Sequence, residues 1–511
     1  MNEPPTSART AARPRRPLLV AVESGPVLHH PPGRVDETSS FFHLRNVVVE
    51  GLACCGTACF VARHRDPGRW AEAERAATPL RCAGSCHVAP AVGGDDTRPA
   101  VVAATGTPVV LERIASGPVT GLADYRAVGG FGGLEVARSS GSDAVIASIE
   151  ASRLRGRGGA AFPVAHKWRA VADAAVRTGL APVVIVNADE GDPGAYVDRR
   201  LLEDDPHAVL EGTAIAAHAV GATTALVYVR AEYPAARAAI ATAAEEASSD
   251  GVFGELDIAV VDGHGSYVCG EETALIEAIE GRRPQVRPRP PYPAEHGLHG
   301  RPTLVQNVET LVSVPWIVRH GGDAYASLGS GTSRGTKALS LSSLFARPGI
   351  YEVELGVPLR HVVDDLGGGL AEGELRGLIV GGPLVGIVPP TLLDTPLTID
   401  DLRAIGADLG HGGVVAFDER TPVMELAHHV FAFAAAESCG TCTPCRVGAA
   451  EGEAILAAAL RGDRPPDART RFDDVVAALG ATSLCGHGTG LAAFARSLVR
   501  HHPTEVARCL G

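Results

Sequence analysis

The chain has 511 residues, 45% of them hydrophobic and 21% charged, and its formal net charge at pH 7 is −13. An acidic chain of this composition argues against a nucleic-acid-binding surface and against intrinsic disorder, and its length predicts about three or four globular domains. No stretch reaches the roughly 18 consecutive apolar residues that a membrane-spanning helix needs, so we expect a soluble protein without direct membrane insertion.

Residues 1–33 are rich in Pro, Arg and Ser, which predicts a disordered tail. The apolar run Leu18–Val22 after the basic residues of this tail is too short for an export signal. Of the 11 cysteines in the chain, most fall into two ligand-like groups rather than scattered pairs. Such grouping is typical of metal sites in a reducing compartment, so the sequence predicts a cytoplasmic protein.

The first cysteine group has the pattern C-x4-C, a gap, and C-x3-C. Its ligand candidates are Cys54, Cys59, Cys82 and Cys86. Cys55 is an extra thiol beside them, and strands are predicted at 47–49 and 100–103. A metal cluster is the favoured interpretation, while a small zinc site or buried free cysteines remain the alternatives.

The middle of the chain alternates between strand and helix patterns. Strands are predicted at 182–186, 225–229 and 256–261, and helices at 205–221, 235–247 and 271–280. This alternation predicts a mostly parallel sheet with helices on its faces.

Three glycine-rich loops interrupt this region. The first, L-R-G-R-G-G-A-A-F-P at 154–163, formally contains a dinucleotide fingerprint, but the segment before it is predicted as a helix, and the fingerprint requires a strand. It is better interpreted as a loop whose backbone N–H groups approach an anion. The loops 187–194 and 263–272 follow strands and combine glycines with acidic residues. Because parallel sheets bind ligands at the carboxyl ends of their strands, we expect a pocket there.

The C-terminal quarter contains the second cysteine group, C-x-x-C-x-x-C followed by one distant cysteine. The members of this group are Cys439, Cys442, Cys445 and Cys485. Three thiolates around one loop plus a remote fourth suit a [4Fe–4S] cluster, with zinc as the weaker alternative. Helices predicted at 424–438, 446–462, 471–484 and 491–501 form the bundle expected to carry it. His487, His501 and His502 are expected to be surface or capping residues, and Cys269 and Cys509 to be unligated.

Several motifs together resemble a known family. They are R-G-R-G-G-A-A-F-P-x3-K-W, N-A-D-E-G-D-P-G, C-G-E-E-T-A-L, E-S-C-G-T-C-T-P-C-R and S-L-C, in this order over residues 115–500. They resemble the NADH-binding flavoprotein subunit of respiratory complex I and the diaphorase subunits of soluble formate dehydrogenases and bidirectional hydrogenases. Asp192, the L-A-D-Y-R stretch at 122–126 and the fused front segment favour the formate dehydrogenase or hydrogenase branch.

The resemblance implies a multidomain α/β fold. The expected parts are a thioredoxin-like [2Fe–2S] domain at 34–114, a Rossmann-like FMN- and NADH-binding domain at 115–330, a β-grasp insert of the soluble-ligand-binding type at 331–420, and a helical [4Fe–4S] domain at 421–511. Short strands at 337–341 and 377–380 belong to the insert, which is expected to act as a spacer.

The resemblance also implies site residues. Flavin and nucleotide contacts are expected from Gly156, Arg157, Gly158, Phe162, Lys167, Asn187, Asp189, Glu190, Tyr267, Gly270, Glu271, Glu272, Arg289, Tyr292, Gln306 and Asn307. Within this set NADH stacks on Phe162, Glu272 takes the adenosine ribose hydroxyls and favours NADH over NADPH, and Glu190 and Asp192 lie near the nicotinamide. No side chain is expected to act as a nucleophile or a catalytic acid.

The implied function is hydride transfer between NADH and FMN, followed by one-electron transfer through the clusters to or from a partner subunit. That partner would be a formate dehydrogenase, a hydrogenase or a complex I-like assembly. The alternatives are a redox-sensing or scaffold subunit without flavin turnover, and a zinc-containing nucleotide-binding module without flavin.

Overall fold

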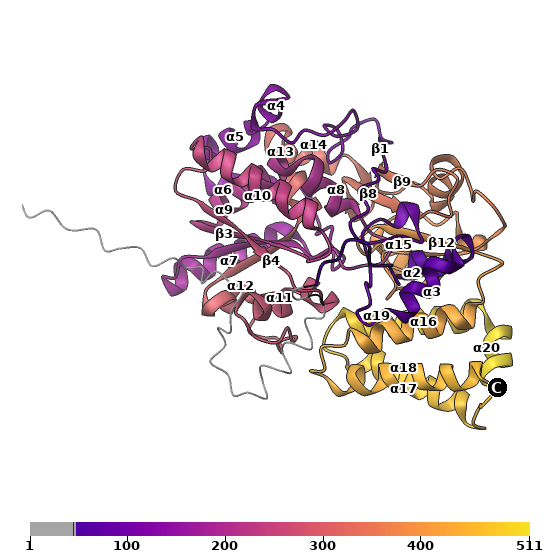
Figure 1. Cartoon of the computed structure of the whole chain (residues 1–511). Helices are drawn as coiled ribbons and strands as arrows, with labels where there is room; N and C mark the ends of the chain where they lie inside the picture. The colour runs from indigo at the N-terminus through magenta and orange to yellow at the C-terminus, as the bar shows by residue number, and fades with distance from the viewer. Residues whose placement is uncertain (1–43, 45–46) are drawn as a thin grey trace, which may run out of the picture.

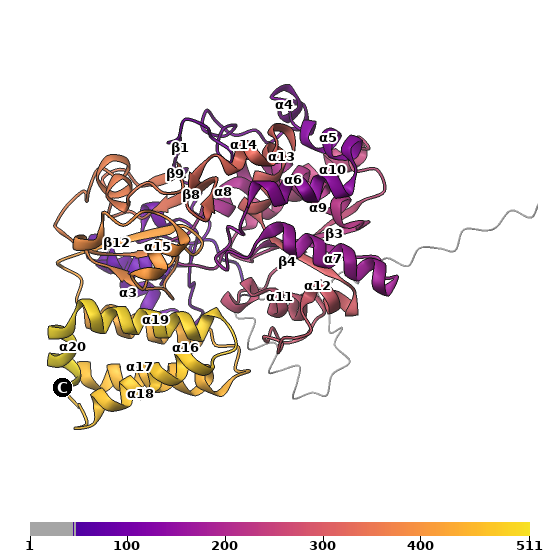
Figure 2. The same cartoon turned by 180° about the vertical axis from the view of Figure 1, so that it is seen from behind.

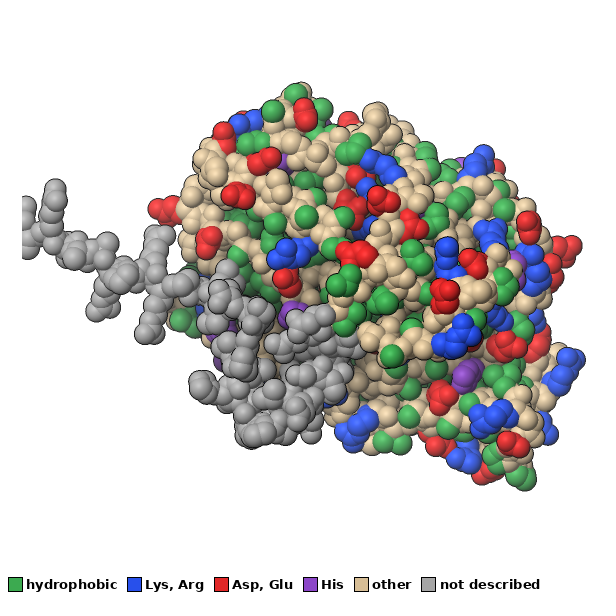
Figure 3. Space-filling view, in the orientation of Figure 1, with side chains coloured by type: hydrophobic (Ala, Val, Ile, Leu, Met, Phe, Trp, Pro, Cys, Tyr) green, Lys and Arg blue, Asp and Glu red, His purple; other side chains and the backbone are tan. Residues whose placement is uncertain are grey.

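The structure is a computed structural model that describes residue 44 and residues 47–511; the predicted tail at 1–33 lies outside the described residues. The described part contains two larger sheets with their helices, a two-stranded hairpin and a C-terminal helical bundle (Figure 1). On the face in Figure 3, acidic and basic side chains are intermingled. Among the described residues no helix is long and apolar enough to cross a membrane.

A four-stranded parallel sheet forms the centre of the first half of the molecule. Its strands are β2 (Val183–Ala188), β3 (Thr224–Val229), β4 (Asp257–Asp262) and β5 (Thr303–Asn307), in the order β4-β3-β2-β5. The helices α9 (Pro206–Val220), α10 (Pro234–Ser249) and α11 (Glu272–Ile279) confirm the predicted alternation. Further helices in this half are α4 (Leu122–Ala127), α5 (Gly132–Ser140), α6 (Ser142–Ser152), α7 (Val164–Thr178), α8 (Val197–Asp204), α12 (Pro293–His296), α13 (Val308–His320) and α14 (Gly322–Ala326).

Both faces of this sheet are covered because β2 and its neighbours are apolar at nearly every position. Val184 and Val186 face the large core that includes α9 and α13, whereas Val183 and Ile185 face a second core with Leu275 of α11. Alternation along a strand sends successive side chains to opposite faces, so a continuous apolar run needs helices on both.

The strand order creates a crevice. The chain leaves β2 towards β3 on one side and returns to β5 on the other, so the carboxyl ends of β2 and β5 meet where the connections diverge. Open α/β sheets bind ligands at such a point. The loop after β2 begins at Asp189, and β5 ends at Asn307, directly before α13.

The second sheet is six-stranded and mixed. Its order is β1-β9-β8-β12-β10-β11, formed by β1 (Ala100–Ala103), β8 (Thr336–Leu341), β9 (Gly349–Glu354), β10 (Leu375–Val380), β11 (Ile387–Val388) and β12 (Gly413–Asp418). The predicted strands at 337–341 and 377–380 are confirmed as β8 and β10, and α15 (Ile399–Ala404) precedes β12. A small hairpin of β6 (Gly329–Ser330) and β7 (Ser333–Arg334) leads into this part.

The C-terminal helices confirm the predicted bundle. They are α16 (Val423–Ala436), α17 (Thr443–Leu460), α18 (Ala468–Thr482) and α19 (Gly486–His501), followed by the short α20 (Pro503–Leu510), which the sequence pattern does not predict. Figure 2 shows α19 on the side of the bundle that faces the mixed sheet, consistent with its contacts to β11. The bundle therefore approaches the other domains through the helix that Cys485 precedes.

The front segment corrects two predictions. Val47–Val49 is not a strand, and the described part of 34–114 holds α2 (Thr57–Val61), α3 (Pro67–Arg75) and β1 without a sheet of its own. Strand β1 instead pairs in parallel with β9 of the mixed sheet. The segment is therefore not a thioredoxin-like domain, because the stretch between Cys59 and Cys82 is filled by α3 and has no strands to build one.

The front segment is held to the parallel-sheet domain by two buried arginines. Arg199 donates to the Gly84 carbonyl at 3.2 Å and to the Ser85 hydroxyl at 2.7 Å. Arg230 donates to the Cys82 carbonyl at 3.2 Å. The cysteine loop thus packs as part of the main body of the molecule.

Candidate flavin, nucleotide and iron–sulfur sites

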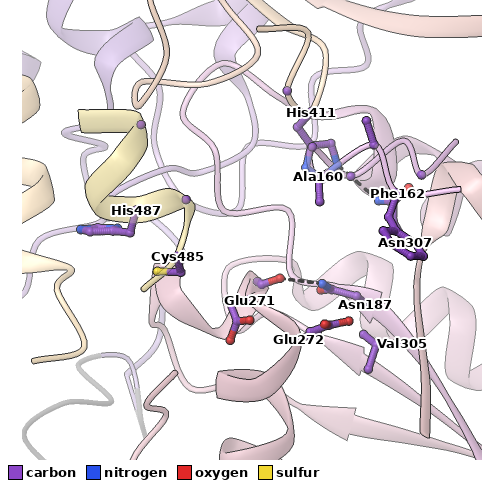
Figure 4. A pocket seen from close by; sticks show the side chains of 18 of the residues that line it. Ala160, Phe162, Asn187, Glu271, Glu272, Val305, Asn307, His411, Cys485 and His487 are labelled. Carbon is purple, nitrogen blue, oxygen red and sulfur yellow. Dashed lines mark hydrogen bonds between the residues drawn. The ribbon is translucent and has the colours of Figure 1, made fainter. Parts of the chain in front are cut away.

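A cavity of about 1370 Å³ opens at the carboxyl ends of β2 and β5 (Figure 4). The predicted residues that line it are Gly156, Gly158, Phe162, Lys167, Asn187, Asp189, Asp192, Tyr267, Gly270, Glu271, Glu272, Arg289, Tyr292, Gln306 and Asn307. Residues far apart in the sequence therefore meet at the crevice that the strand order creates.

One wall of the cavity is built to receive an anion. A Cβ atom on Gly158 would lie 2.9 Å from Cβ of Asn307, so only glycine lets this loop approach β5 so closely. Asn307 is the N-cap of α13, with its side chain accepting from the Thr310 N–H at 3.1 Å. Backbone N–H groups at a glycine-rich loop beside a helix N-terminus fit a phosphate group.

A partly buried ion-pair cluster forms the opposite wall. Lys167 Nζ lies 2.6 Å from Glu272 Oε2, and Arg289 lies 3.1 Å from Glu272 Oε1 and 3.3 Å from Glu271 Oε1. Burial alone would raise the pKa of Glu272, but Lys167 and Arg289 outweigh it and lower that pKa. Glu271 also caps α11 by accepting from two backbone N–H groups. Glu272 is therefore an ionised carboxylate with a fixed position.

Unsatisfied groups in the lining indicate a missing ligand. The rings of Phe162 and Tyr292 are 53% and 54% exposed although both belong to the cavity. Asp189 is 8% exposed, its Oδ2 has no hydrogen-bond partner, and burial raises its pKa well above the usual value. Exposed rings and a buried unpartnered carboxyl fit a site for a flavin and a nucleotide, whose rings stack and whose hydroxyls donate.

Two predicted residues do not line the cavity. Arg157 points away from it and donates to the Tyr325 hydroxyl at 2.8 Å and the Arg334 carbonyl at 2.6 Å, which fixes the glycine-rich loop. Glu190 is fully buried and accepts from the Asp198 and Arg199 N–H groups at the start of α8. Arg157 and Glu190 therefore hold neighbouring segments in place without lining the cavity.

The mixed-sheet domain contributes a wall that sequence reasoning missed. Residues between β10 and β11 and in the loop ahead of β12 line the cavity, among them Gly381, Leu384, Val385, Gly410 and His411. The domain predicted as a spacer is therefore part of the site. The sequence signal for this wall is the G-H-G-G run at 410–413. Such a run has the same local pattern as an ordinary turn, so it does not predict a cavity wall.

The C-terminal cysteines meet beside the same cavity. Cys442 and Cys485 are the N-cap residues of α17 and α19, and Cys439 and Cys445 are buried next to them. Burial, with smaller contributions from the nearby Glu271, Cys439 and Cys445, raises the pKa of Cys485 to about 12. Four free thiols that share one environment, two of them at helix N-termini, fit an iron–sulfur cluster, whose iron would hold them as thiolates.

The front cysteines also converge. Cys82 Sγ and Cys86 Sγ lie 3.8 Å apart, and Cys54 and Cys59 are buried against them. Four backbone N–H groups donate to these sulfur atoms, each at 3.4 Å. Donors aimed at sulfur are a feature of iron–sulfur sites, so the residues fit a cluster even without the predicted thioredoxin-like sheet.

Comparisons with known proteins agree with this geometry. The model of the Nuo51 FMN-binding domain matches residues 149–316, and that of the NADH-ubiquinone oxidoreductase-F iron-sulfur binding region matches residues 425–509. An F-type NADH-quinone oxidoreductase chain of Rhizobium meliloti is 36% identical over 408 residues, 78% of this chain and 96% of the relative. NADP-reducing hydrogenase subunit HndC of Solidesulfovibrio fructosivorans is 38% identical over 375 residues, covering 71% and 76%.

A solved structure extends the similarity to the front segment. A chain of an NAD⁺-reducing [NiFe]-hydrogenase in the H₂-reduced state aligns with a TM-score of 0.78 at 30% identity. The alignment covers 94% of this chain and 88% of that one. The chain therefore belongs to the family of F-type NADH-quinone oxidoreductase chains and their hydrogenase relatives, as an NADH-oxidising protein with FMN and a [4Fe–4S] cluster as cofactors.

Proposed function

We propose that this chain transfers hydride between NADH and FMN in the large cavity and exchanges single electrons with a partner subunit through its clusters. The observation that carries this proposal is that Cys485 lines the same cavity as the flavin and nucleotide loops. FMN, when bound, takes up an electron pair as hydride and releases electrons singly, which links a nicotinamide to an iron–sulfur cluster.

Each wall of the cavity has a separate task in this proposal. The glycine-rich loop and Asn307 at the start of α13 bind the flavin phosphate. Phe162 offers its exposed ring for stacking, and Asn187, held by its hydrogen bond to the Gly270 carbonyl at 2.8 Å, orients the flavin. Asp192 lies at the nicotinamide side and accepts from the Tyr267 hydroxyl at 2.6 Å. Side chains position rings and exclude water, and none has to act as a nucleophile.

Glu272 makes the site selective for NADH. Its carboxylate would accept hydrogen bonds from the adenosine ribose and would repel a 2′-phosphate. Lys167 and Arg289 keep that carboxylate ionised, which strengthens the repulsion. One relative is named as an NADP-reducing subunit, so the preference for NADH is a specific expectation for this chain.

The front cysteines Cys54, Cys59, Cys82 and Cys86 would hold a second cluster, which we assign as [2Fe–2S]. The partner subunit is expected to belong to a complex I-like or hydrogenase-like redox assembly, because the relatives above are chains of NADH-quinone oxidoreductases and of hydrogenases. A formate dehydrogenase partner and a cytoplasmic location remain predictions from the sequence.

The test is anaerobic reconstitution with iron, sulfide and FMN, followed by reduction with NADH or NADPH under optical and EPR observation. NADH is expected to bleach the flavin and reduce the [4Fe–4S] cluster, with NADPH at least about tenfold less effective. Cys485→Ser should keep NADH-dependent flavin reduction and lose the cluster signal.

Cys269→Ser is the matched control, because Cys269 is a buried thiol near the cavity that belongs to neither quartet. It should retain flavin, iron and NADH-dependent electron transfer. A wild-type chain that binds clusters but neither FMN nor NADH would instead support the redox-sensing or scaffold alternative. A colourless protein with stoichiometric zinc would overturn the assignment of both sites.

A further inference from the structure

His411 lies on the cavity wall that the mixed-sheet domain supplies. Figure 4 shows its ring beside Ala160 of the glycine-rich loop and above Asn307. The residue is 6% exposed, and Nε2 lies 2.9 Å from Asp198 Oδ2 and 3.7 Å from Glu190 Oε1. Its Nδ1 lies 3.7 Å from Asp192 Oδ2. One imidazole thus faces the buried carboxylates of Glu190 and Asp198 and the partly exposed carboxylate of Asp192, from two segments of the parallel-sheet domain.

This arrangement favours a positive charge on the ring, and burial together with the neighbouring Asp198 raises the pKa of Glu190 to about 7. Burying carboxylates away from water is costly unless a cation compensates them. Burial alone would lower the pKa of His411, but Asp198, Glu190 and Asp192 together outweigh it and raise the pKa to about 9. At neutral pH the ring is therefore an imidazolium.

The backbone around His411 is held as firmly as its ring. Lys337 Nζ donates to the His411 carbonyl at 3.0 Å and forms a fully buried ion pair with Glu309 of α13. Glycine on either side, with φ of +50° at Gly410 and +91° at Gly412, permits the turn that brings the ring into the cavity. The charge therefore has a fixed place relative to the glycine-rich loop.

His411 also connects to groups expected to touch the flavin and the nicotinamide. Asn307 Nδ2 donates to Asp198 Oδ2 at 2.6 Å and lies 3.5 Å from His411 Nε2. Asp192 is held between His411 and the Tyr267 hydroxyl. Removal of the imidazolium would loosen both residues and leave the cavity with uncompensated negative charge.

We propose that His411 is a positioning residue that keeps a positive charge beside the bound flavin and favours its hydride-reduced state. The inference rests on the proposed function. Hydride transfer moves one proton and two electrons from C4 of NADH to the flavin, so the nicotinamide becomes cationic and the flavin gains one negative charge. A fixed cation in a low-dielectric cavity stabilises that charge.

The test compares the flavin midpoint potential of the reconstituted holoprotein with that of His411→Gln and His411→Lys. The neutral glutamine should favour oxidised flavin by at least tenfold, a downward shift of about 30 mV for a two-electron couple. The lysine restores a cation and should recover most of the shift. His361→Gln is the control, because His361 pairs with Asp365 at the surface, 2.8 Å away.

The pH dependence of the flavin potential gives a second readout. The groups that face His411 are Glu190, Asp192, Asp198 and Asn307, with Lys337 at its carbonyl. In the wild type the potential should gain an additional downward step as His411 loses its proton near pH 9. The glutamine variant should lack this step.

An unchanged potential in both variants, or a wild-type pH profile without the step, would overturn the role of His411. A purely structural role would lower flavin occupancy in His411→Gln and His411→Lys alike without moving the potential. Failure of the proposed function is distinguishable, because wild-type protein would then bind no FMN or would not be reduced by NADH.

Discussion

Lys167 and Arg289 each form an ion pair with the Glu272 carboxylate. All three residues belong to the cofactor-binding set that the sequence predicts. Lys167→Met removes the partner at 2.6 Å. We expect the loss of this charged hydrogen bond to cost about 2 kcal/mol at pH 7 and to lower the thermal midpoint by roughly 2 °C.

The pKa of Glu272 sets how the stability loss in Lys167→Met depends on pH. Because the pKa of Glu272 is lowered in the folded state, its stabilising contribution is present above the ordinary value of 4.5 and is lost as the pH falls through the folded pKa. Thermal unfolding followed from pH 8 to well below pH 4.5 should therefore show the midpoints of the wild type and Lys167→Met converging only at the acid end of the range. Arg169→Met, on the same helix but paired with the exposed Asp143, should change the midpoint little.

Replacement of Phe162 tests whether its ring stacks on the nucleotide. Since its ring is 53% exposed, Phe162→Ala should alter the free energy of unfolding by less than about 0.5 kcal/mol. It should nevertheless weaken nucleotide binding by about tenfold, the usual effect of losing one aromatic stack. Isothermal titration of the holoprotein with NAD⁺ measures this effect. Val176→Ala, an 87% exposed side chain on α7 outside the cavity, should bind like the wild type.

Local motifs predicted most of the residues that line the cavity, but not the direction of every side chain. The glycine spacing indicates a tight anion-binding loop, and the structure places Gly156 and Gly158 in the lining. Arg157, in the middle of the same motif, faces Tyr325 and Arg334 instead. The direction of a loop side chain depends on which distant acceptors the fold brings near, so no local pattern reveals it.

At the scale of elements, the front segment offers a test of the second cluster. Cys82→Ser should remove one set of EPR signals and part of the iron while leaving flavin reduction by NADH intact. Cys55→Ser is the matched control, because the Cys55 thiol donates to the Leu80 carbonyl at 3.3 Å and lies outside the quartet. Equal iron loss in both variants would mean that the segment had unfolded rather than lost a ligand.

The pair Glu309–Lys337 joins two elements, α13 of the flavin domain and β8 of the mixed sheet. Both side chains are fully buried, so Lys337→Met leaves a carboxylate without its cation and should cost about 3–5 kcal/mol. The double variant Glu309→Leu/Lys337→Met removes both charges and should be more stable than the single one. Urea unfolding followed by far-UV circular dichroism compares the three proteins.

At the scale of the whole molecule, the pair of His411 and Asp198 ties the mixed-sheet domain to α8. The folded pKa of His411, about 9, exceeds its ordinary value of 6.5, so the contribution is fully present below 6.5 and is lost as the pH rises through 9. We expect His411→Gln to be less stable by on the order of 2–3 kcal/mol at pH 6. Above pH 9 the thermal midpoints of the two proteins should converge, with or without flavin.

The sequence by itself determined the main strands and helices of the parallel sheet and of the C-terminal bundle, and the chemistry of this protein. Two cysteine groups, three glycine-rich loops and the strand–helix alternation all have short-range signatures, because ligand spacing, positive φ and apolar periodicity are local properties. Only the tertiary structure decided that β1 joins the mixed sheet instead of a thioredoxin-like one, that a predicted spacer forms a wall of the flavin cavity, and that His411 meets Asp198 there. Strand pairing and domain contact depend on surfaces that lie far apart along the chain. The local sequence pattern does not reveal the free energies of these long-range contacts.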